Sequence, residues 1–234
     1  MGRPSLKRAL LRAGIVRPSP DAPPAGRKNR GVAPPPLVFL PGEAPVPEPP
    51  PADLAALFGR SAPVELEIGP GRARFLLARA REHPERDFLG AEMEEEYALI
   101  AQARAERLGL TNVRFLRLDG KAFVRRLTPG SLSALHVYFP DPWPKKRHHK
   151  RRLFDAAFAA DAARALAGGA LLRAASDHAE YWEVIREVLD AEPGLAPVGE
   201  DEAGAWEAGT SYEAKFLRQG RPIQRGIWRR GPRA

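Results

Sequence analysis

Short apolar runs of strand length alternate with amphipathic segments of helix length from residue 54 to residue 228. The apolar runs predict strands at residues 64–68, 88–91, 113–118, 132–139, 170–175, 195–198 and 223–228. The amphipathic segments predict helices at residues 54–58, 74–82, 94–108, 153–166 and 181–189, the fourth of them ended by Gly168 and Gly169. This alternation predicts an α/β fold with a doubly wound parallel sheet.

Residues 1–52 differ in composition from the rest of the chain. They hold more than half of the 25 prolines, and basic residues are scattered through the first thirty positions. Proline runs cannot form a helix or a central strand, so we expect an arm that is largely extended or disordered. A short helix at residues 4–13 and an edge strand at residues 37–40 are the exceptions that we expect. Two interpretations of this arm stay open: a basic arm that touches RNA, and a solubilising tail or a strap across the domain. We expect residues 53–234 to form the folded domain.

Charge and composition narrow the classes of function. The chain has 234 residues and a formal net charge of +8, which favours a polyanionic partner, nucleic acid first and an anionic membrane second. The sequence has no cysteine, which excludes disulfides, cysteine-ligated zinc and thiol nucleophiles. No apolar run reaches the roughly 20 residues that a membrane span needs, and the N-terminus lacks the apolar core of a signal peptide. We therefore expect a soluble, cytoplasmic protein.

The first predicted strand in the folded domain runs directly into a glycine turn. Gly69, Pro70 and Gly71 follow residues 64–68, and a predicted helix comes next. Strand, glycine turn and helix together are the context of a nucleotide-binding loop, because glycine lets the backbone approach a ligand and the helix start supplies free N–H groups. The third small residue of the turn is Ala73 where glycine is usual, which weakens the pattern.

Four successive predicted strands end near an acidic residue, namely Glu67, Glu92, Asp119 and Asp141. Because the carboxyl ends of parallel strands share one edge of a sheet, we expect these carboxylates to line one crevice. Glu92 lies about twenty residues beyond the glycines, where an acidic side chain accepts hydrogen bonds from a ribose diol. A negative crevice suits the cationic S-adenosylmethionine and repels the pyrophosphate of NAD, so the pattern favours a methyltransferase over a dehydrogenase.

The stretch from Phe139 to Arg152 combines several signals. Asp141 lies between two prolines that restrict the backbone, so its carboxylate is held at a strand end. Trp143 offers a face on which a base can stack, and Lys145 begins a basic run that can meet phosphates. Taken singly, these features are an ordinary turn, a packed indole and a solvated charged face. Their combination in one stretch indicates a nucleic-acid site beside a carboxylate.

This stretch resembles the signature of the bacterial tRNA (guanine-N7-)-methyltransferases, and the resemblance extends from about Leu57 to Trp228. It implies a Rossmann-like class I S-adenosylmethionine-dependent methyltransferase whose mostly parallel sheet ends in an antiparallel strand. The implied reaction moves a methyl group from S-adenosyl-L-methionine to N7 of a guanine in the tRNA variable loop, position 46. The resemblance also implies tRNA as the partner, no obligatory protein partner, and a monomer or homodimer.

The resemblance assigns roles to residues that match the motifs of the family. The implied cofactor contacts are Glu67, Gly69, Gly71, Glu92, Asp119 and Asp141, of which Asp141 is also the catalytic residue. The implied substrate contacts are Lys145, Asp177, Thr210, Ser211, Tyr212 and Glu213. The implied RNA contacts are Arg147, His148, His149, Lys150, Arg151 and Arg152. We expect no metal site, because two adjacent histidines point in different directions, and His178 stands where the family usually has tryptophan.

The mechanism follows partly from the chemistry of guanine. Its N7 atom carries a lone pair and no proton, so in-line attack on a sulfonium methyl group needs no general base. A carboxylate at Asp141 would orient the guanine and stabilise the positive charge that develops on it. Two other classes stay open. One is an exocyclic-amine methyltransferase. Residues 141–143 distantly resemble the motif of those enzymes, although Pro144 follows the aromatic residue here and does not precede it. The other is a non-catalytic RNA-binding module.

Overall fold

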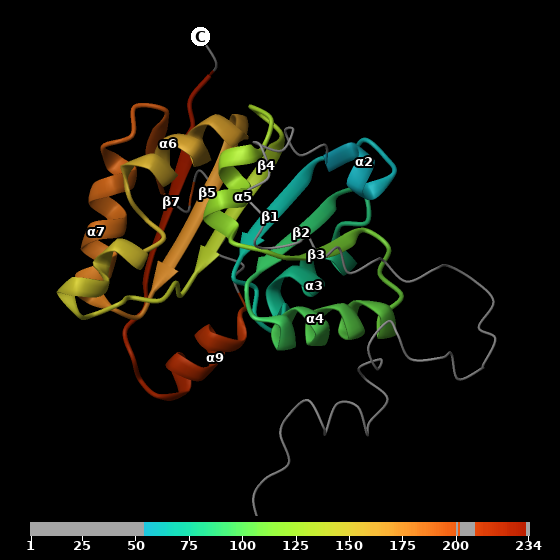
Figure 1. Ribbon diagram of the computed structural model, residues 1–234, viewed down its shortest axis with the longest axis horizontal. Helices are drawn as coiled ribbons and strands as arrows, with labels where there is room; N and C mark the ends of the chain where they lie inside the picture. The colour runs from blue at the N-terminus through green and yellow to red at the C-terminus, as the bar shows by residue number, and fades with distance from the viewer. Residues whose placement is uncertain (1–53, 200, 202–208, 233–234) are drawn as a thin grey trace, which may run out of the picture.

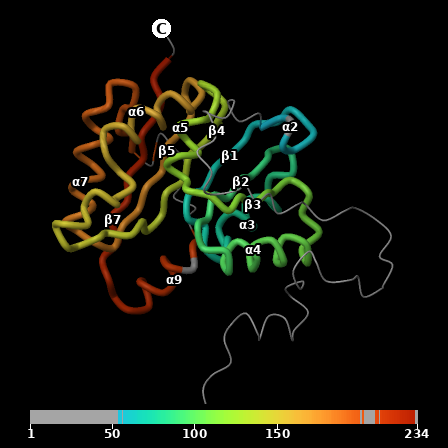
Figure 2. Tube along the Cα trace, viewed as in Figure 1, coloured from blue at the N-terminus to red at the C-terminus, as the bar shows by residue number. Residues whose placement is uncertain are grey.

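The structure, a computed structural model, describes residues 54–199, 201 and 209–232. The predictions for the arm, including a helix at residues 4–13, an edge strand at residues 37–40 and a boundary near residue 52, lie outside the described residues. Within the described residues a central sheet is covered by helices on both faces, as Figure 1 and Figure 2 show.

Seven strands form this sheet, in the order β3-β2-β1-β4-β5-β7-β6. The strands that run parallel to their neighbours are β1 (Val64–Ile68), β2 (Asp87–Glu92), β3 (Val113–Arg117), β4 (Leu132–Tyr138) and β5 (Leu166–Ser176). β7 (Gln224–Arg230) pairs antiparallel with both β5 and β6 (Leu195–Val198). The predicted mostly parallel sheet with a last antiparallel strand is confirmed. The strand order reverses between β1 and β4, whose carboxyl ends lie side by side, and this is where open α/β sheets bind ligands.

Helices pack on both faces because the strands present apolar side chains on both. One face packs against α2 (Leu54–Phe58), α5 (Gly120–Arg126), α6 (Ala156–Ala165) and α7 (Ala179–Asp190). The other face packs against α3 (Arg74–Glu82) and α4 (Glu95–Arg107). In β1 the alternation of side chains buries Leu66 in the first core and turns Glu65 and Glu67 toward the face that α3 covers.

The fourth predicted helix differs from the observed α6. The side chain of Asp155 caps α6, which therefore begins one residue later, well inside the predicted range. The helix ends before Leu166, because that residue already pairs with β4. Gly168 and Gly169 consequently lie inside β5, at an irregularity in its pairing where Gly169 has a φ of 80°. The prediction that these glycines end the helix is wrong.

The apolar pattern missed two short helices, α5 and α9 (Ser211–Arg218), and the 3-10 turn η1 (Lys146–Arg151). Each of the two helices begins at a side-chain cap, Asp119 for α5 and Thr210 for α9. They contain 7 and 8 residues, too few for helical periodicity to stand out in a sequence. The capping residues of both helices are therefore present in the sequence, but the apolar pattern that follows each of them is too short to predict a helix.

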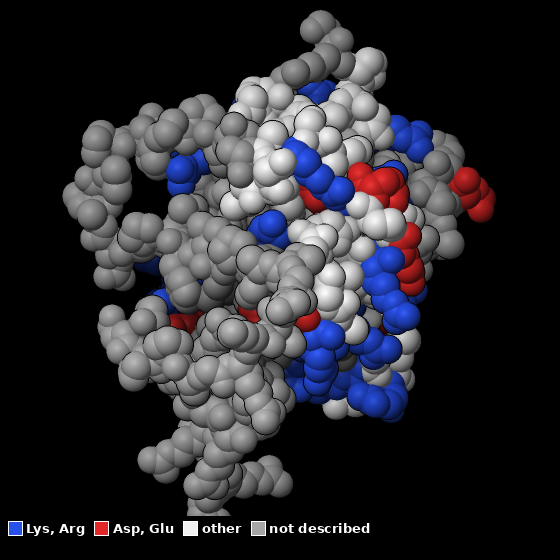
Figure 3. Space-filling view, turned by 90° about the vertical axis from the view of Figure 1, so that its right-hand side faces the viewer, with Lys and Arg blue, Asp and Glu red and all other residues white. Residues whose placement is uncertain are grey.

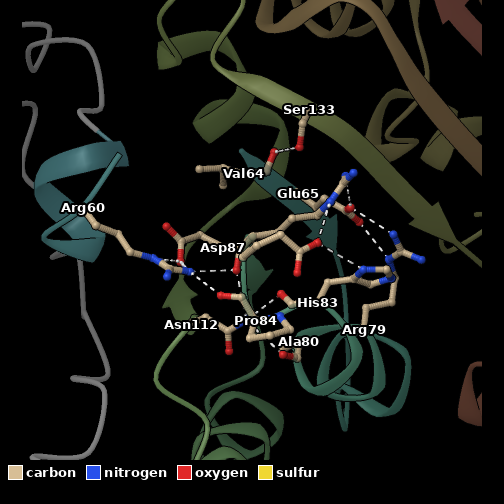
Figure 4. Close-up of polar contacts among 12 residues, drawn as sticks. Arg60, Val64, Glu65, Arg79, Ala80, His83, Pro84, Asp87, Asn112 and Ser133 are labelled. Carbon is tan, nitrogen blue, oxygen red and sulfur yellow. Dashed lines mark hydrogen bonds and ion pairs between the residues drawn. The ribbon is translucent and has the colours of Figure 1, made fainter. Parts of the chain in front are cut away.

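A buried ion cluster joins β1 to β4 and α3 (Figure 4). The carboxylate of Glu65 is only 1% exposed and accepts hydrogen bonds from Arg79 Nε at 2.9 Å, Arg86 Nη1 at 3.0 Å and His136 Nε2 at 3.0 Å. Burial alone would raise the pKa of Glu65, but the hydrogen bonds from His136 and Arg79 hold this pKa well below its usual range. Glu65 is therefore ionised, and its charge fixes the donors around it.

Candidate cofactor and substrate site

A cavity of about 320 Å³ opens at the carboxyl ends of β1 and β4. Its walls come from β1, the glycine turn, the first turns of α3 and α4, the end of β4, and α9. The lining residues are Glu67, Gly69, Pro70, Gly71, Arg72, Arg74, Phe75, Tyr97, Tyr138, Phe139, Thr210, Tyr212 and Lys215. Five of the predicted site residues therefore meet around one cavity, and they belong to two segments that are about 140 positions apart in the sequence.

The glycine turn is held in place by hydrogen bonds to β2. The N–H of Gly69 donates to the carbonyl of Ala91 at 2.8 Å, and the N–H of Gly71 donates to Glu92 Oε2 at 2.9 Å. Both glycines have positive φ, at 69° and 55°, which their lack of a Cβ allows. Ala73 also has a positive φ, 52°, at the start of α3. The turn thus keeps its conformation with alanine where glycine is usual, at a cost of about 1 kcal/mol.

Glu67 lies in the wall of the cavity with an oxygen that has no partner. Its side chain is 3% exposed, and Oε2 forms no hydrogen bond with any described residue. Burial, and secondarily the charge of Glu92, raise the pKa of Glu67 to about 8. An uncompensated buried carboxyl group of this kind is costly unless a cationic ligand or a hydrogen-bond donor faces it. The chemistry of this wall therefore suits a cation.

A buried hydrogen-bond chain determines what Tyr138 offers to the cavity. Because ionised Glu65 can only accept, the Nε2 atom of His136 carries the proton that it donates to Glu65. Burial lowers the pKa of His136, so the ring is neutral and its Nδ1 atom is an acceptor. The Tyr138 hydroxyl, 2.9 Å from Nδ1, consequently donates to His136 and can only accept from a further partner. Tyr138 thus adds an acceptor to the wall that holds Glu67.

The sequence prediction missed His136 and Tyr138, although one signal for them was present. Both residues occupy alternate positions of β4, and the register places His136 opposite Glu67 of the neighbouring β1. Polar residues at alternate positions of two buried strands share one face and can form a network. The pairing of β1 with β4 is what identifies the network, and it is known only from the sheet order.

The other predicted cofactor residues lie outside the lining of the cavity. Glu92 Oε2 accepts from Gly71, and its Oε1 accepts from the N–H of Glu94 at 3.0 Å. Asp119 follows β3 and caps α5 by accepting from the N–H of Lys121 at 2.8 Å. Both carboxylates are at the predicted sheet edge, where Glu92 stabilises the glycine turn through its hydrogen bond with Gly71. Their contact with a cofactor stays a prediction.

The loop that carries Asp141 is held in a strained conformation. Phe139 has a φ of 55° and Trp143 a φ of 43°, and apart from Ala73 these are the non-glycine residues with positive φ in the described chain. Each such residue costs about 1–3 kcal/mol and tends to occur where a site constrains the backbone. Phe139 lines the cavity and packs against Phe216 of α9, with ring centroids 5.3 Å apart. Asp141 is exposed just beyond this wall.

The basic run of η1 divides into exposed cations and one buried anchor. Lys145, Arg147, Lys150 and Arg151 are exposed. Arg152 is 7% exposed, and its Nε donates to the carbonyl of Pro142 at 2.8 Å. The guanidinium also bonds to Glu180 and lies over the ring of Tyr181 at 4.8 Å. Arg152 therefore holds the loop against α7, whereas its exposed neighbours remain accessible to a ligand.

Two side chains of the run, His148 and Arg151, pack against Trp143. The ring of His148 meets Trp143 edge to face at 5.8 Å, and Arg151 lies over the indole at 4.9 Å. His149 is half-buried, and its Nε2 has no hydrogen-bond partner among the described residues. No group of three or more histidine, aspartate or glutamate side chains in the described residues could hold a metal ion.

Five of the six predicted substrate residues lie at α9 or at the end of β5, and the sixth, Lys145, lies at the start of η1. Asp177 pairs with Arg221 at 2.6 Å, and Glu213 pairs with Arg225. The hydroxyl of Thr210 accepts from the N–H of Glu213 and caps α9, whose first residue is Ser211. Tyr212 lines the cavity.

His178 has a structural explanation. Its Nδ1 accepts from the N–H of Tyr181 at 3.3 Å and caps α7. The residue that stands where the family usually has tryptophan therefore starts the next helix.

Comparison with known proteins decides the family. A family model described as "Putative methyltransferase" matches residues 61–225. A tRNA (guanine-N(7)-)-methyltransferase of Leifsonia xyli is 42% identical over 177 residues, which are 75% of this chain and 78% of the relative. The corresponding protein of Aeromonas hydrophila is 37% identical over 183 residues, 77% of this chain and 76% of the relative. This chain belongs to the tRNA (guanine-N7-)-methyltransferase family.

Solved structures agree on the fold. The 16S rRNA methyltransferase KamB aligns with a TM-score of 0.52 at 18% identity, covering 76% of this chain and 92% of that one. A 16S rRNA (adenine(1408)-N(1))-methyltransferase from Catenulisporales acidiphilia, solved with its cosubstrate SAM, also aligns with a TM-score of 0.52, at 16% identity, covering 77% and 91%. The fold of this family member is that of the class I methyltransferases. Among the described residues, no helix is both long and apolar enough to span a membrane.

The cavity fits S-adenosylmethionine, the cofactor of these methyltransferases. Glu67 supplies a buried carboxyl with an oxygen to spare, and Tyr138 supplies an acceptor beside it. Both suit the cationic end of the cofactor. At Gly69 and Gly71 an added Cβ would meet nothing within 4 Å, so the space that their absent side chains leave is open to a ligand.

We expect Glu67→Gln to stabilise the free protein while weakening cofactor binding. The folded chain keeps the Glu67 proton up to about pH 8, whereas the ordinary pKa of a glutamate is 4.5, so unfolding releases a proton between these values and stability falls as the pH rises. Glutamine has no proton to release. The Tm of the variant should therefore exceed that of the wild type by a few degrees at about pH 8 and equal it near pH 5.

The same variant should bind S-adenosylmethionine at least about tenfold more weakly at pH 8 in calorimetry, because the cation loses its counter-charge. Glu82→Gln, at the exposed end of α3, is the matched control and should change neither quantity. A Tm that falls at pH 8, or unchanged affinity, would contradict the role given to Glu67.

Proposed function

We propose that this chain transfers a methyl group from S-adenosyl-L-methionine to N7 of a guanine in the tRNA variable loop, at position 46. The carrying observation is one cavity that has the buried carboxyl of Glu67 in its wall and the strained loop of Asp141 at its rim, directly before a run of exposed cations. The names of the relatives support both the reaction and tRNA as the substrate.

The residues of the chain would act mainly by positioning. S-adenosylmethionine supplies the methyl group on a positively charged sulfur. Glu67 and Tyr138 would bind the cationic end of the cofactor, and Gly69 and Gly71 would let the backbone approach it. The guanine N7 lone pair needs no general base. The carboxylate of Asp141 would orient the ring and stabilise the positive charge that develops on it.

Glu92 and Asp119 would complete the cofactor site. Glu92 lies at the end of β2, which is next to β1, and Asp119 follows β3, which is one strand further from β1. Both are at the sheet edge that carries the cavity. Glu92 would accept from the ribose diol, since a carboxylate has lone pairs beyond the two that its backbone partners use. Asp119 would accept from the adenine amino group.

Guanine recognition falls to the carboxylates near α9. The Watson–Crick edge of guanine presents an N–H and an amino group, both donors, so Asp177 and Glu213 offer the complementary acceptors. Arg221 and Arg225 occupy part of these carboxylates, and the remaining lone pairs would serve the base. The arginines would thereby hold both acceptors in place.

The other predicted substrate residues would frame the base. Tyr212 offers its ring at the cavity wall, where an unstacked guanine could lie. Thr210 and Ser211 start α9 and so place Tyr212. Lys145 would contact the nucleotide from the N-terminus of η1.

Exposed members of the basic run would bind RNA. Arg147, Lys150 and Arg151 would contact phosphates, and His148 and His149 would join the same RNA-binding face. Arg152 would act indirectly by holding the loop. We propose that the protein acts in the cytoplasm as a monomer or homodimer, without an obligatory protein partner.

Methyl transfer from labelled S-adenosylmethionine to an unmodified tRNA transcript tests the reaction. We expect transfer that requires the variable-loop guanine and a product that borohydride and aniline cleave at that position. A transcript with adenine in its place is the control and should accept no label. Asp141→Asn should lower kcat about a hundredfold with the affinity for the cofactor retained. Transfer without cleavage would indicate an exocyclic-amine methyltransferase, and absence of transfer would indicate a binding module.

The basic run separates into two predicted effects. Replacing Lys150 and Arg151 together with alanine should raise KM for tRNA several-fold and reduce the salt slope of binding by about 2, with Tm unchanged. Arg152→Ala should lower Tm by several degrees, because it removes a buried guanidinium that bonds to Pro142 and packs on Tyr181. Thermal melting and tRNA titrations at several salt concentrations measure both. Unaltered tRNA kinetics in the double variant would show that the basic run is not part of the RNA-binding site.

A further inference from the structure

A second group of basic side chains lies on the opposite side of the cavity from η1. Arg72 and Arg74 line the cavity, at the start of α3. Arg104 of α4 donates to the carbonyl of Arg72, and Arg107 follows one turn later. These four residues, the α3–α4 arginine cluster, lie outside the basic run that the sequence singled out.

The charges of this cluster are not compensated within the described chain. None of its four arginines forms an ion pair with a described carboxylate. Burial lowers the pKa of Arg104, and the positive charges of Arg107, Arg72 and Arg74 lower it further. Glu106, which precedes Arg107 in the sequence, accepts a hydrogen bond from the side chain of Gln102. Four like charges held together in this way repel one another, and an anion bound between them would offset this repulsion.

Neighbouring arginines on the same part of the molecule behave differently. Arg60 pairs with Asp87, and both Arg79 and Arg86 pair with Glu65. Arg117, on β3 beside α4, pairs with Glu95. Figure 3 views the molecule from the side of α2, β3 and α4 and shows basic side chains gathered over its lower part, with acidic ones mainly above them. Arg60, Arg79, Arg86 and Arg117 thus each have a carboxylate partner, whereas the four arginines of the cluster have none among the described residues.

The sheet order places the two basic groups on either side of the cavity. α4 packs against β2 and β3, and η1 is tied to α7 through Arg152 and Glu180. α7 in turn packs against β5, β6 and β7. The cavity at β1 and β4 lies between these halves of the sheet, so the groups are separated by about four strand spacings, or about 20 Å. A nucleic acid that delivers a base to the cavity would pass both.

We propose that Arg72, Arg74, Arg104 and Arg107 form a second phosphate-binding surface for the tRNA, across the cavity from η1. This inference rests on the proposed function. RNA is favoured over an acidic protein because the cluster borders the cavity that would receive the target base. Arg104 and Arg107 are outside the lining of the cavity, so their contribution can be separated from any contact of Arg72 and Arg74 with the cofactor carboxylate.

The test compares two double variants with equal loss of charge. Arg104→Gln with Arg107→Gln removes two cluster charges. Arg125→Gln with Arg186→Gln removes two exposed charges from α5 and α7, on the other face of the sheet. Methyl transfer, tRNA titrations between about 50 and 200 mM salt, S-adenosylmethionine calorimetry and thermal melting are measured for each.

We expect the cluster variant to raise KM for tRNA about tenfold and to reduce the salt slope by one to two, with cofactor affinity and kcat retained. The control variant should change KM less than about twofold. Because Arg104 also bonds to a carbonyl, Arg107→Gln alone should show a smaller change of the same kind at unchanged Tm. Lysine at both positions should restore most of the affinity, since it keeps the charge.

Equal salt slopes in the cluster variant and the control, or a lysine variant as weak as the glutamine variant, would overturn the inference. So would a loss confined to cofactor affinity. Failure of the proposed function is a distinct result, because then the wild-type protein itself methylates no tRNA.

Discussion

An uncompensated carboxyl group buried at the carboxyl end of β1 is the constraint on which the site depends. Glu67 is in the wall of the cavity, and one of its oxygens has no partner among the described residues. Burial and the nearby Glu92 both oppose its ionisation, so the free protein holds a proton there. Such a group reduces stability and is useful only when a cation binds. Tyr138, whose proton is committed to His136, adds an acceptor to the same wall.

The distribution of charge around this group separates two ligands of opposite sign. Carboxyl groups occupy the ends of the central strands, where the positively charged cofactor would lie. Cations occupy the rim on both sides, in η1 and in the α3–α4 arginine cluster, where an RNA backbone would lie. The strained loop of Asp141 joins the two regions and would bring the guanine to the methyl group. The same sheet edge can therefore bind a cationic cofactor and an anionic RNA, because the carboxyl groups and the cations of the protein occupy different parts of it.

Much of this arrangement could be predicted from the sequence. Apolar periodicity and the glycine turn are local signals, and they were sufficient for the strand positions apart from the start of β5, for most of the helices and for the placement of Glu67 beside Gly69 and Gly71. The remainder depends on pairing between distant segments. The role of Tyr138 follows from the register of β1 with β4 and from a charge on Glu65. The burial of Arg152 depends on α7, and the arginine cluster joins residues about 30 positions apart. Gly168 and Gly169 misled the prediction because strand pairing ended the helix before them.

Proton release on cofactor binding is the most direct measurement of the central claim, that a neutral Glu67 becomes ionised when a cation enters. Calorimetric titration of S-adenosylmethionine in buffers of different ionisation enthalpy gives the number of protons exchanged, and Glu67→Gln subtracts any titration of the cofactor itself. Because the pKa of Glu67 is about 8, the account predicts that the wild type releases close to one proton more than the variant near pH 7 and none more near pH 10. Equal proton exchange by the two proteins near pH 7 would contradict it.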